Sequence, residues 1–226
     1  MRVGLAVLLV AGWWAVHPWW MATARAEPQT CPPVCDQIPH TAWLPARSIP
    51  LDAAYHWPAP STIAVTLTGE APGLRFRFEE LCATPVLPED PRKYAVVSQA
   101  TVTHPDGQWQ LHAHVLHWRG ETARGGQVVA AVFNAAGILL RSCQLGAPTQ
   151  SPAITIDQPN RLAAVLSGPV LMRTYLVAHP QSSTISELSL WALSPPQLAW
   201  SSTSADQVLD AMTAALCAAY VASCPW

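Results

Sequence analysis

The sequence predicts an α+β domain: one mainly antiparallel sheet with two helices packed on it, a proline-rich N-terminal arm, and disulfides that tie the parts together. Three observations predict this class. Apolar residues recur at every second position in several segments, and at spacings of three and four in two others. All six cysteines lie at or after Cys31, which is typical of an exported, disulfide-tied chain.

The first 26 residues have the pattern of a secretory signal peptide. Arg2 precedes an apolar run over 3–16, and small residues at 24 and 26 form a cleavage motif. A retained membrane anchor is the alternative, because four tryptophans lengthen the apolar stretch. We expect cleavage near Glu27, a secreted or cell-envelope location, and no stable membrane span afterwards.

The charge balance excludes one class of partner. Without Arg2 and Arg25, acidic residues outnumber basic ones in the exported part. We therefore expect no nucleic-acid partner. Lys93 is the only lysine, and this bias, with abundant alanine and proline, indicates a GC-rich genome such as that of an actinobacterium.

Residues 27–60 form the proline-rich arm, and residues 61–226 the single α+β domain. Each proline fixes φ and removes a backbone donor, so the arm has no sustained period. Its aromatic content favours an ordered segment that lies on the domain, with Trp43, Tyr55 and Trp57 as buried anchors.

The domain alternates between strand and helix patterns. Alternation predicts strands over 63–67 and 74–78, and a hairpin over 94–118 with its turn at 104–107. A helical stripe predicts a helix over 121–143, and a second one over 206–220 with Ser204 as its N-cap. Three further strands are predicted between these helices, over 161–167, 170–179 and 184–193.

The helical stripe also suggests a disulfide. Cys143 ends the buried stripe and should face the sheet, so Cys82–Cys143 is the preferred pair. The pairing of the other four cysteines stays open: Cys31, Cys35, Cys217 and Cys224. Two of them, Cys217 and Cys224, can pair only if the last helix ends before Cys224, because two helical turns span about 10 Å.

The order of hairpin, cysteine-ended helix, long hairpin and C-terminal cysteine-bearing helix resembles the extracellular sensor domains of mycobacterial Ser/Thr kinases and related lipoproteins. The segments "CPPVCDQIPHTAWLPARSIPLDAAYHWP" and "QWQLHAHVLHWRGETARGGQ" are similar to uncharacterised exported proteins of mycobacteria and actinobacteria. The first resemblance implies disulfide-tied helices and a cleft for an unidentified ligand. It does not imply kinase activity.

The stretch "TCPPVC" resembles the copper-binding motif of the Sco-type copper chaperones. Two thiolates and a distant histidine would suit Cu(I), because soft ligands select a soft ion. The motif starts too early in the exported chain for that fold, and a structural disulfide or disulfides at Cys31 and Cys35 are the favoured interpretation. The metal alternative for the whole chain combines Cys31 and Cys35 with His112 and His114, to bind copper or zinc.

The stretch "LHAHVLHW" places three histidines on one predicted strand. Because side chains alternate faces, His112 and His114 share one face and His117 lies on the other. We expect a half-solvated polar face with no metal and no cofactor. A two-histidine platform would need a third ligand, for which the sequence offers several residues: His104, His179, Glu79, Glu80 and Asp106.

The sequence lacks the motifs of common enzymes. It has no G-x-S-x-G elbow and no P-loop. Ser182 and Ser183 follow His179, but adjacency in sequence does not make a catalytic pair. The carboxylates at 79–80 would point to opposite faces of a strand, and those at 89–90 lie between prolines in a loop. Neither arrangement supports a two-carboxylate active site. We expect a non-enzyme, with a secreted hydrolase as the third hypothesis.

The leading hypothesis is therefore a secreted, disulfide-stabilised, non-enzymatic protein of the cell envelope that binds an unknown ligand or protein partner. Tryptophan and arginine can form a cleft that stacks and hydrogen-bonds a ligand. The candidate binding residues lie where the hairpin meets the first long helix: Trp118, Arg119, Arg124, His112 and His114.

Overall fold

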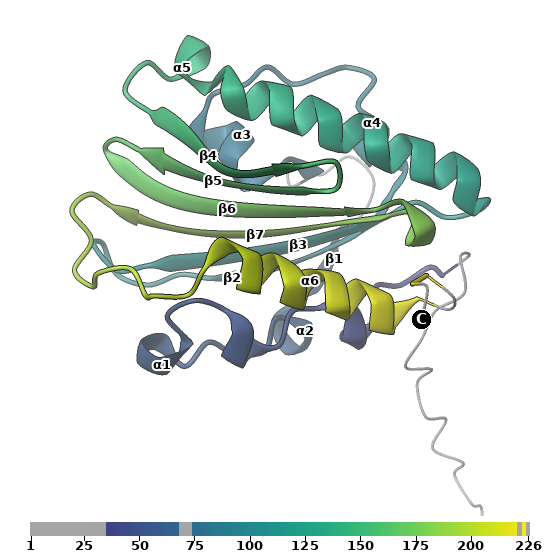
Figure 1. Ribbon diagram of the computed structural model, residues 1–226, viewed down its shortest axis with the longest axis horizontal. Coiled ribbons are helices and arrows are strands. Elements are labelled where there is room, and N and C mark those ends of the chain that lie inside the picture. Colours follow the sequence, from purple (N-terminus) through teal and green to yellow (C-terminus); the bar gives the residue numbers. More distant parts are fainter. Residues whose placement is uncertain (1–34, 68–73, 221–222, 225–226) are drawn as a thin grey trace, which may run out of the picture.

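The computed structural model describes residues 35–67, 74–220 and 223–224, so the predicted signal peptide lies outside the described residues. Its centre is a seven-stranded antiparallel sheet of order β1-β2-β3-β7-β6-β5-β4 (Figure 1). The strands are β1 (Val65–Leu67), β2 (Val96–Val102), β3 (Gln110–His117), β4 (Ser151–Gln158), β5 (Arg161–Ser167), β6 (Val170–His179) and β7 (Thr184–Leu193).

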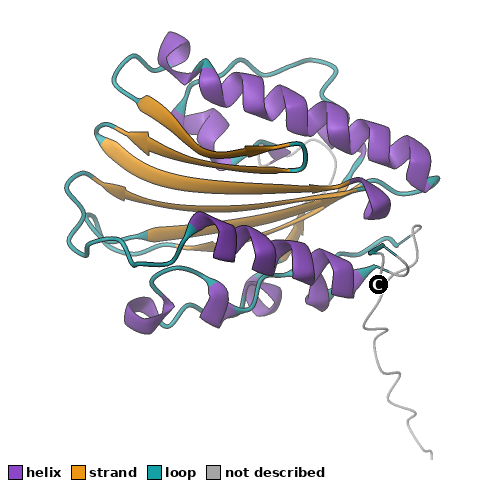
Figure 2. Ribbon diagram, viewed as in Figure 1, coloured by secondary structure: helices purple, strands orange, loops and turns teal. Residues whose placement is uncertain are grey.

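Helices cover both faces of this sheet (Figure 2). One face carries α4 (Thr122–Arg141) with the short α3 (Arg77–Leu81) and α5 (Cys143–Gly146), and the other carries α6 (Ala205–Ala219) with the N-terminal arm. The arm contains η1 (His40–Ala42), η2 (Ala46–Ser48), α1 (Asp52–Tyr55) and α2 (Pro60–Ile63), while η4 (Pro91–Tyr94) and η5 (Pro180–Ser182) are short connections.

The predicted fold class is confirmed, and the structure adds that the two long helices lie on opposite faces. The central strands explain this arrangement. In β7 only two residues, Trp191 and Leu193, are not buried, so both of its faces need a cover. Two separate apolar cores therefore form. The α4-side core lies between the sheet and α4, and the α6-side core lies between the sheet, α6 and the arm.

In the described part of the arm, the prediction of buried anchors holds for Trp43 and Trp57, whereas Tyr55 is only half-buried. Trp43 and Trp57 are buried in the α6-side core, and the Trp57 indole donates a hydrogen bond to the Pro50 carbonyl at 2.9 Å. Helix α6 begins after Ser204, whose hydroxyl accepts a hydrogen bond from the Gln207 amide, as the sequence predicts for an N-cap.

The α4-side core is built on the predicted stripe, because Val129, Phe133 and Leu140 are all buried. Two glycines let the start of α4 approach η5 closely. A Cβ atom at Gly126 would lie 2.9 Å from the Pro180 carbonyl oxygen. Among the described helices only α4 is long and apolar enough to cross a membrane, yet its apolar stripe packs on the sheet.

The predicted strand over 74–78 is wrong. Helix α3 begins at Arg77, because the Glu79 carboxylate accepts a hydrogen bond from the Phe76 amide at 2.8 Å and caps the first turn. Phe76 and Phe78 are buried in the α4-side core. Strand β4 was not predicted, and it lies at an edge of the sheet with one face exposed.

Two disulfides tie this fold. Cys82 pairs with Cys143, as predicted, with their Cα atoms 4.7 Å apart, and joins the end of α3 to α5. Cys217 pairs with Cys224, with Cα atoms 5.4 Å apart, because α6 ends at Ala219. Cys35 is also disulfide-bonded, whereas Cys31 lies outside the described residues.

Candidate functional site: a polar groove over buried histidines

The α4-side face of β2, β3 and β7 carries an unusual patch of polar side chains. Strand register places Gln99, His114 and Glu187 in one row across three strands. The next row contains Thr101 and His112 with Ser189 of β7. Neighbours on one face of paired strands lie about 4.5–5.5 Å apart, so the register alone brings these side chains together.

A groove of about 530 Å³ opens over this patch. His112 lies in its lining, and Arg77 of α3 stacks over the Trp191 ring at 4.4 Å from the ring centroid. The other lining side chains come from α3 and the residues before it, from β2, the β2–β3 turn and the start of β3, and from the start of β6 and the end of β7: Arg75, Glu80, Gln99, Thr101, Thr103, His104, Asp106, Gln108, Gln110, Val170, Ala192 and Leu193.

Below the groove, two histidines and a glutamate face one another. His112 Nε2 lies 3.7 Å and His114 Nδ1 lies 3.8 Å from Glu187 Oε2. His114 is fully buried and Glu187 is 1% exposed. Within the described part of the chain, these three atoms have no hydrogen-bond partner. With His114 Nε2, the cluster holds four buried polar atoms that lack a partner among the described residues, which is rare in native proteins.

Burial sets the protonation of this cluster. Desolvation lowers the pKa of His112 to about 4 and the pKa of His114 to about 3, so both imidazoles are neutral at neutral pH. The charge of Arg92 further lowers the pKa of His114. Desolvation also raises the pKa of Glu187, although His112, the Arg77 amide and the Ser189 hydroxyl oppose this shift.

A buried ion network holds α3 beside the site. The Arg92 guanidinium donates hydrogen bonds to both carboxylate oxygens of Glu79, at 2.5 and 3.1 Å, and to Asp90 at 2.6 Å. Arg92 also lies over the Phe76 ring at 5.0 Å. The Arg77 amide at the start of α3 then donates to Glu187 Oε1 at 2.7 Å, which links the helix directly to the polar cluster.

The structure separates the predicted binding residues into two groups. His112 and His114 belong to the groove and its base, whereas Trp118, Arg119 and Arg124 line a second hollow of about 330 Å³ with Tyr94. Trp118 follows His112 by six residues, which corresponds to about 20 Å between their Cα atoms along an extended strand. The Trp118 indole donates to the Pro91 carbonyl, and Arg119 pairs with Asp36.

The prediction of a half-solvated histidine face is wrong. His112 is only 8% exposed, and His117, on the opposite face as predicted, is fully buried beside Thr184 and Tyr220. A second layer covers each face of the sheet, which the sequence of one strand does not reveal. The division of the three histidines by the strand pleat is confirmed.

The predicted third ligands do not join the histidine pair. Glu79 pairs with Arg92 and Glu80 with Arg77, while His104 packs against Trp57 at 5.5 Å. Asp106 lies in the turn that rims the groove, and His179 lies at the Cys217–Cys224 disulfide. The residue that does join is Glu187, a single carboxylate within an otherwise apolar and hydroxyl-bearing strand, which was the signal available in the sequence.

The proposed combination of C-x-x-x-C with H-x-H does not form in the described residues. Cys35 packs against the α6-side core, whereas His112 and His114 lie on the α4 side, so the sheet separates them. Cys35 is also disulfide-bonded and offers no thiolate.

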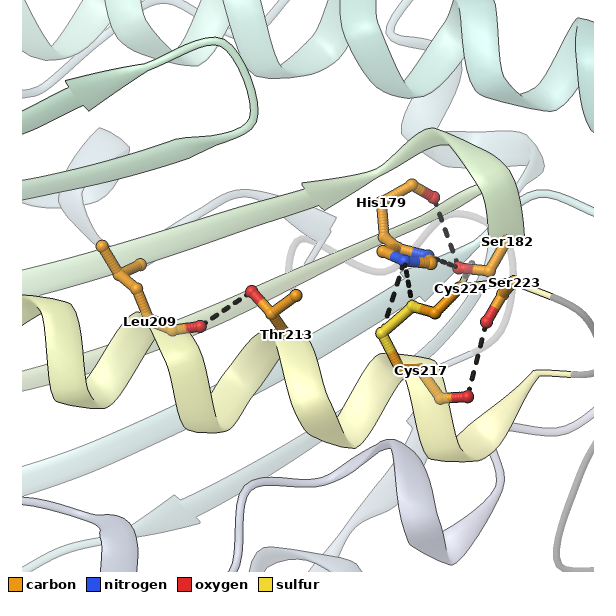
Figure 3. Close-up of a disulfide and its surroundings, with 7 residues drawn as sticks. All are labelled: His179, Ser182, Leu209, Thr213, Cys217, Ser223 and Cys224. Carbon is orange, nitrogen blue, oxygen red and sulfur yellow. Dashed lines mark hydrogen bonds between the residues drawn. A yellow bond between two sulfur atoms is a disulfide. The ribbon is translucent and has the colours of Figure 1, made fainter. Parts of the chain in front are cut away.

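A serine–histidine contact occurs at the other end of the sheet (Figure 3). His179 Nδ1 lies 2.7 Å from Ser182 Oγ, which follows it by three residues at the end of η5. Ser182 is buried, and His179 Nε2 faces Cys224 Sγ of the disulfide at 3.3 Å. This contact has no carboxylate partner among the described residues, so it differs from a catalytic triad.

No protein-family model, no curated protein and no solved structure matches this chain. The resemblance to mycobacterial exported proteins and kinase sensor domains therefore stays a prediction, and the site is interpreted from its own geometry.

Proposed function

We propose that this chain is an exported, non-enzymatic binding protein of the actinobacterial cell envelope, and that it binds a neutral, hydroxyl-rich small molecule such as a saccharide. The signal-like N-terminus and the disulfides support export, because disulfides persist in oxidising compartments. The ligand would occupy the groove above His112.

The lining of the groove carries this proposal. Its volume of about 530 Å³ falls in the usual range for small-molecule sites. Two guanidinium groups, Arg75 and Arg77, are balanced by two carboxylates, Glu80 and Asp106, so the groove favours a ligand without net charge. Amide and hydroxyl side chains around them offer both donors and acceptors, as sugar hydroxyls require.

Trp191 adds an aromatic surface to these polar groups. Its ring is held under Arg77 and lines the groove beside Gln110. An indole with nearby amides can combine apolar contact with hydrogen bonds to one ligand.

A titration of ¹⁵N-labelled protein with glucose, galactose and maltose tests this function. We expect saturable shifts of the Trp191 indole resonance with at least one sugar. Gln99→Ala should weaken binding about fivefold, the loss of one hydrogen bond. Arg124→Ala, which alters the second hollow, is the matched control and should bind normally. Shifts confined to the Trp118 indole, or no saturable shift, would contradict the proposal.

A further inference from the structure

Three buried ligand atoms converge at the base of the groove. His112 Nε2, His114 Nδ1 and Glu187 Oε2 lie within 4.8 Å of one another. Each belongs to a side chain that is at most 10% exposed, and none has a hydrogen-bond partner in the described ranges 35–67, 74–220 and 223–224. Unpaired buried polar atoms are costly, and three that face a common point indicate a bound group between them.

The remaining polar atoms of two of these side chains are held by neighbours. Glu187 Oε1 accepts hydrogen bonds from the Arg77 amide at 2.7 Å and from the Ser189 hydroxyl at 2.9 Å. The free oxygen, Oε2, is therefore fixed toward the histidines. His112 Nδ1 contacts Thr101 Oγ1 at 3.4 Å, which leaves Nε2 for another partner. Outer contacts of this kind orient metal ligands in proteins.

We propose that His112, His114 and Glu187 bind one zinc ion. Two imidazole nitrogens and one carboxylate oxygen form a donor set that zinc commonly accepts. Zn–N bonds of about 2.0–2.1 Å place the ligand atoms of a tetrahedral ion roughly 3.3 Å apart. The separations from Glu187 Oε2 are 3.7 and 3.8 Å, and all three ligand atoms lie within 4.8 Å of one another, so side-chain rotations must bring them closer to reach this geometry.

The surroundings suit a divalent cation. The charge of Arg92, the cation that acts on His114, is balanced by Glu79 and Asp90. His112 also lines the groove, so the groove is the nearest entry for an ion, which would reach the buried Nε2 atom after a movement of the His112 ring and bring a water as the fourth ligand.

This inference goes beyond saccharide binding and does not depend on it. The test uses the chain with its disulfides intact, so that no cysteine thiolate competes for metal. A chelator first removes any metal already bound. Zinc binding is measured by calorimetry, and coordination by the absorption spectrum of the cobalt(II) form. We expect one equivalent of zinc and a rise in Tm of about 5–10 °C at a hundredfold excess over Kd.

Glu187→Gln separates a metal ligand from a structural role. The amide has nearly the same shape but cannot carry the negative charge, so the variant should be at least as stable as the natural protein in chelator. It should nevertheless lose zinc affinity by about a hundredfold or more, beyond the usual effect of an outer contact. His114→Asn should lose it similarly, and Thr101→Val should lose about tenfold.

His56→Asn is the matched control, because His56 is exposed, far from the cluster in the fold, and has a positive φ that asparagine accepts. It should bind zinc like the natural protein. Absence of saturable zinc binding by the natural protein would overturn the proposal. Unchanged affinity in Glu187→Gln, or equal loss in His56→Asn, would also overturn it.

Discussion

The Cys82–Cys143 disulfide should stabilise this domain more than the Cys217–Cys224 disulfide does. The first closes a loop of 61 residues and the second a loop of 7. In the chain-entropy model, a longer loop constrains the unfolded state more, and these lengths correspond to about 4 and about 2 kcal/mol. Cys82 and Cys143 are also fully buried, so their replacement leaves a small cavity that costs about 1 kcal/mol or more.

The perturbation is a pair of double variants, Cys82→Ala with Cys143→Ala, and Cys217→Ala with Cys224→Ala. We expect losses in the free energy of unfolding of about 5 and about 2 kcal/mol. Urea unfolding of the oxidised proteins at neutral pH measures both, with mass spectrometry to verify the remaining pairs. The m-value should rise most for the first variant, because its unfolded chain expands most.

The test depends on the difference in stability loss between the two double variants. If the Cys217/Cys224 variant loses as much stability as the Cys82/Cys143 variant, loop length does not control the effect, and the reasoning is refuted. A loss below about 2 kcal/mol for the first variant would refute it as well, since burial alone contributes part of that amount. The Cys82/Cys143 double variant should also hold α3 less firmly, and α3 positions Arg77 over the groove.

Two other predictions concern buried polar groups. Arg92→Met removes the cation that hydrogen-bonds the buried Glu79 carboxylate and leaves only Arg75, at 4.0 Å, beside it. It should cost about 3 kcal/mol in urea unfolding. Arg92→Met combined with Glu79→Gln should cost less than the sum of the single losses, and strict additivity would contradict the coupling. Burial raises the pKa of Tyr220 to about 12, above its unfolded value of about 10, so its contribution to stability is full below pH 10 and is lost as pH rises toward 12. Between pH 9 and 11 the natural protein should therefore lose about 1.4 kcal/mol more than Tyr220→Phe does, and equal losses in parallel urea titrations would show that this tyrosine is not responsible.

Local patterns predicted most of the elements. The strand segments 161–167, 170–179 and 184–193 agree with β5, β6 and β7 in both bounds, because alternation and turn residues act within a few positions of one another. The segment 74–78 is a case in which local alternation gave the wrong prediction. Its apolar residues alternate as in a strand, but the Glu79 cap and burial of Phe76 and Phe78 against α4 favour a helix.

Local patterns predicted only part of the candidate site, because the rest depends on contacts between segments far apart in the sequence. Strand periodicity placed His112 and His114 on one face, which holds in the structure. Their partner Glu187 lies on a strand far away in the sequence and reaches them through the β3–β7 register. Trp118 is close to the histidines in sequence, yet an extended strand carries it about 13 Å from His114 and about 20 Å from His112.

The sequence by itself determined the fold class, the preferred Cys82–Cys143 pair and the division of the three histidines, because each depends on residue type and short-range spacing. Only the tertiary structure decided that the histidine face is buried, that Glu187 completes the cluster, and that a groove opens above it. The physical reason is that burial and convergence depend on which layer covers a strand and on the register of strands that the chain joins over long distances.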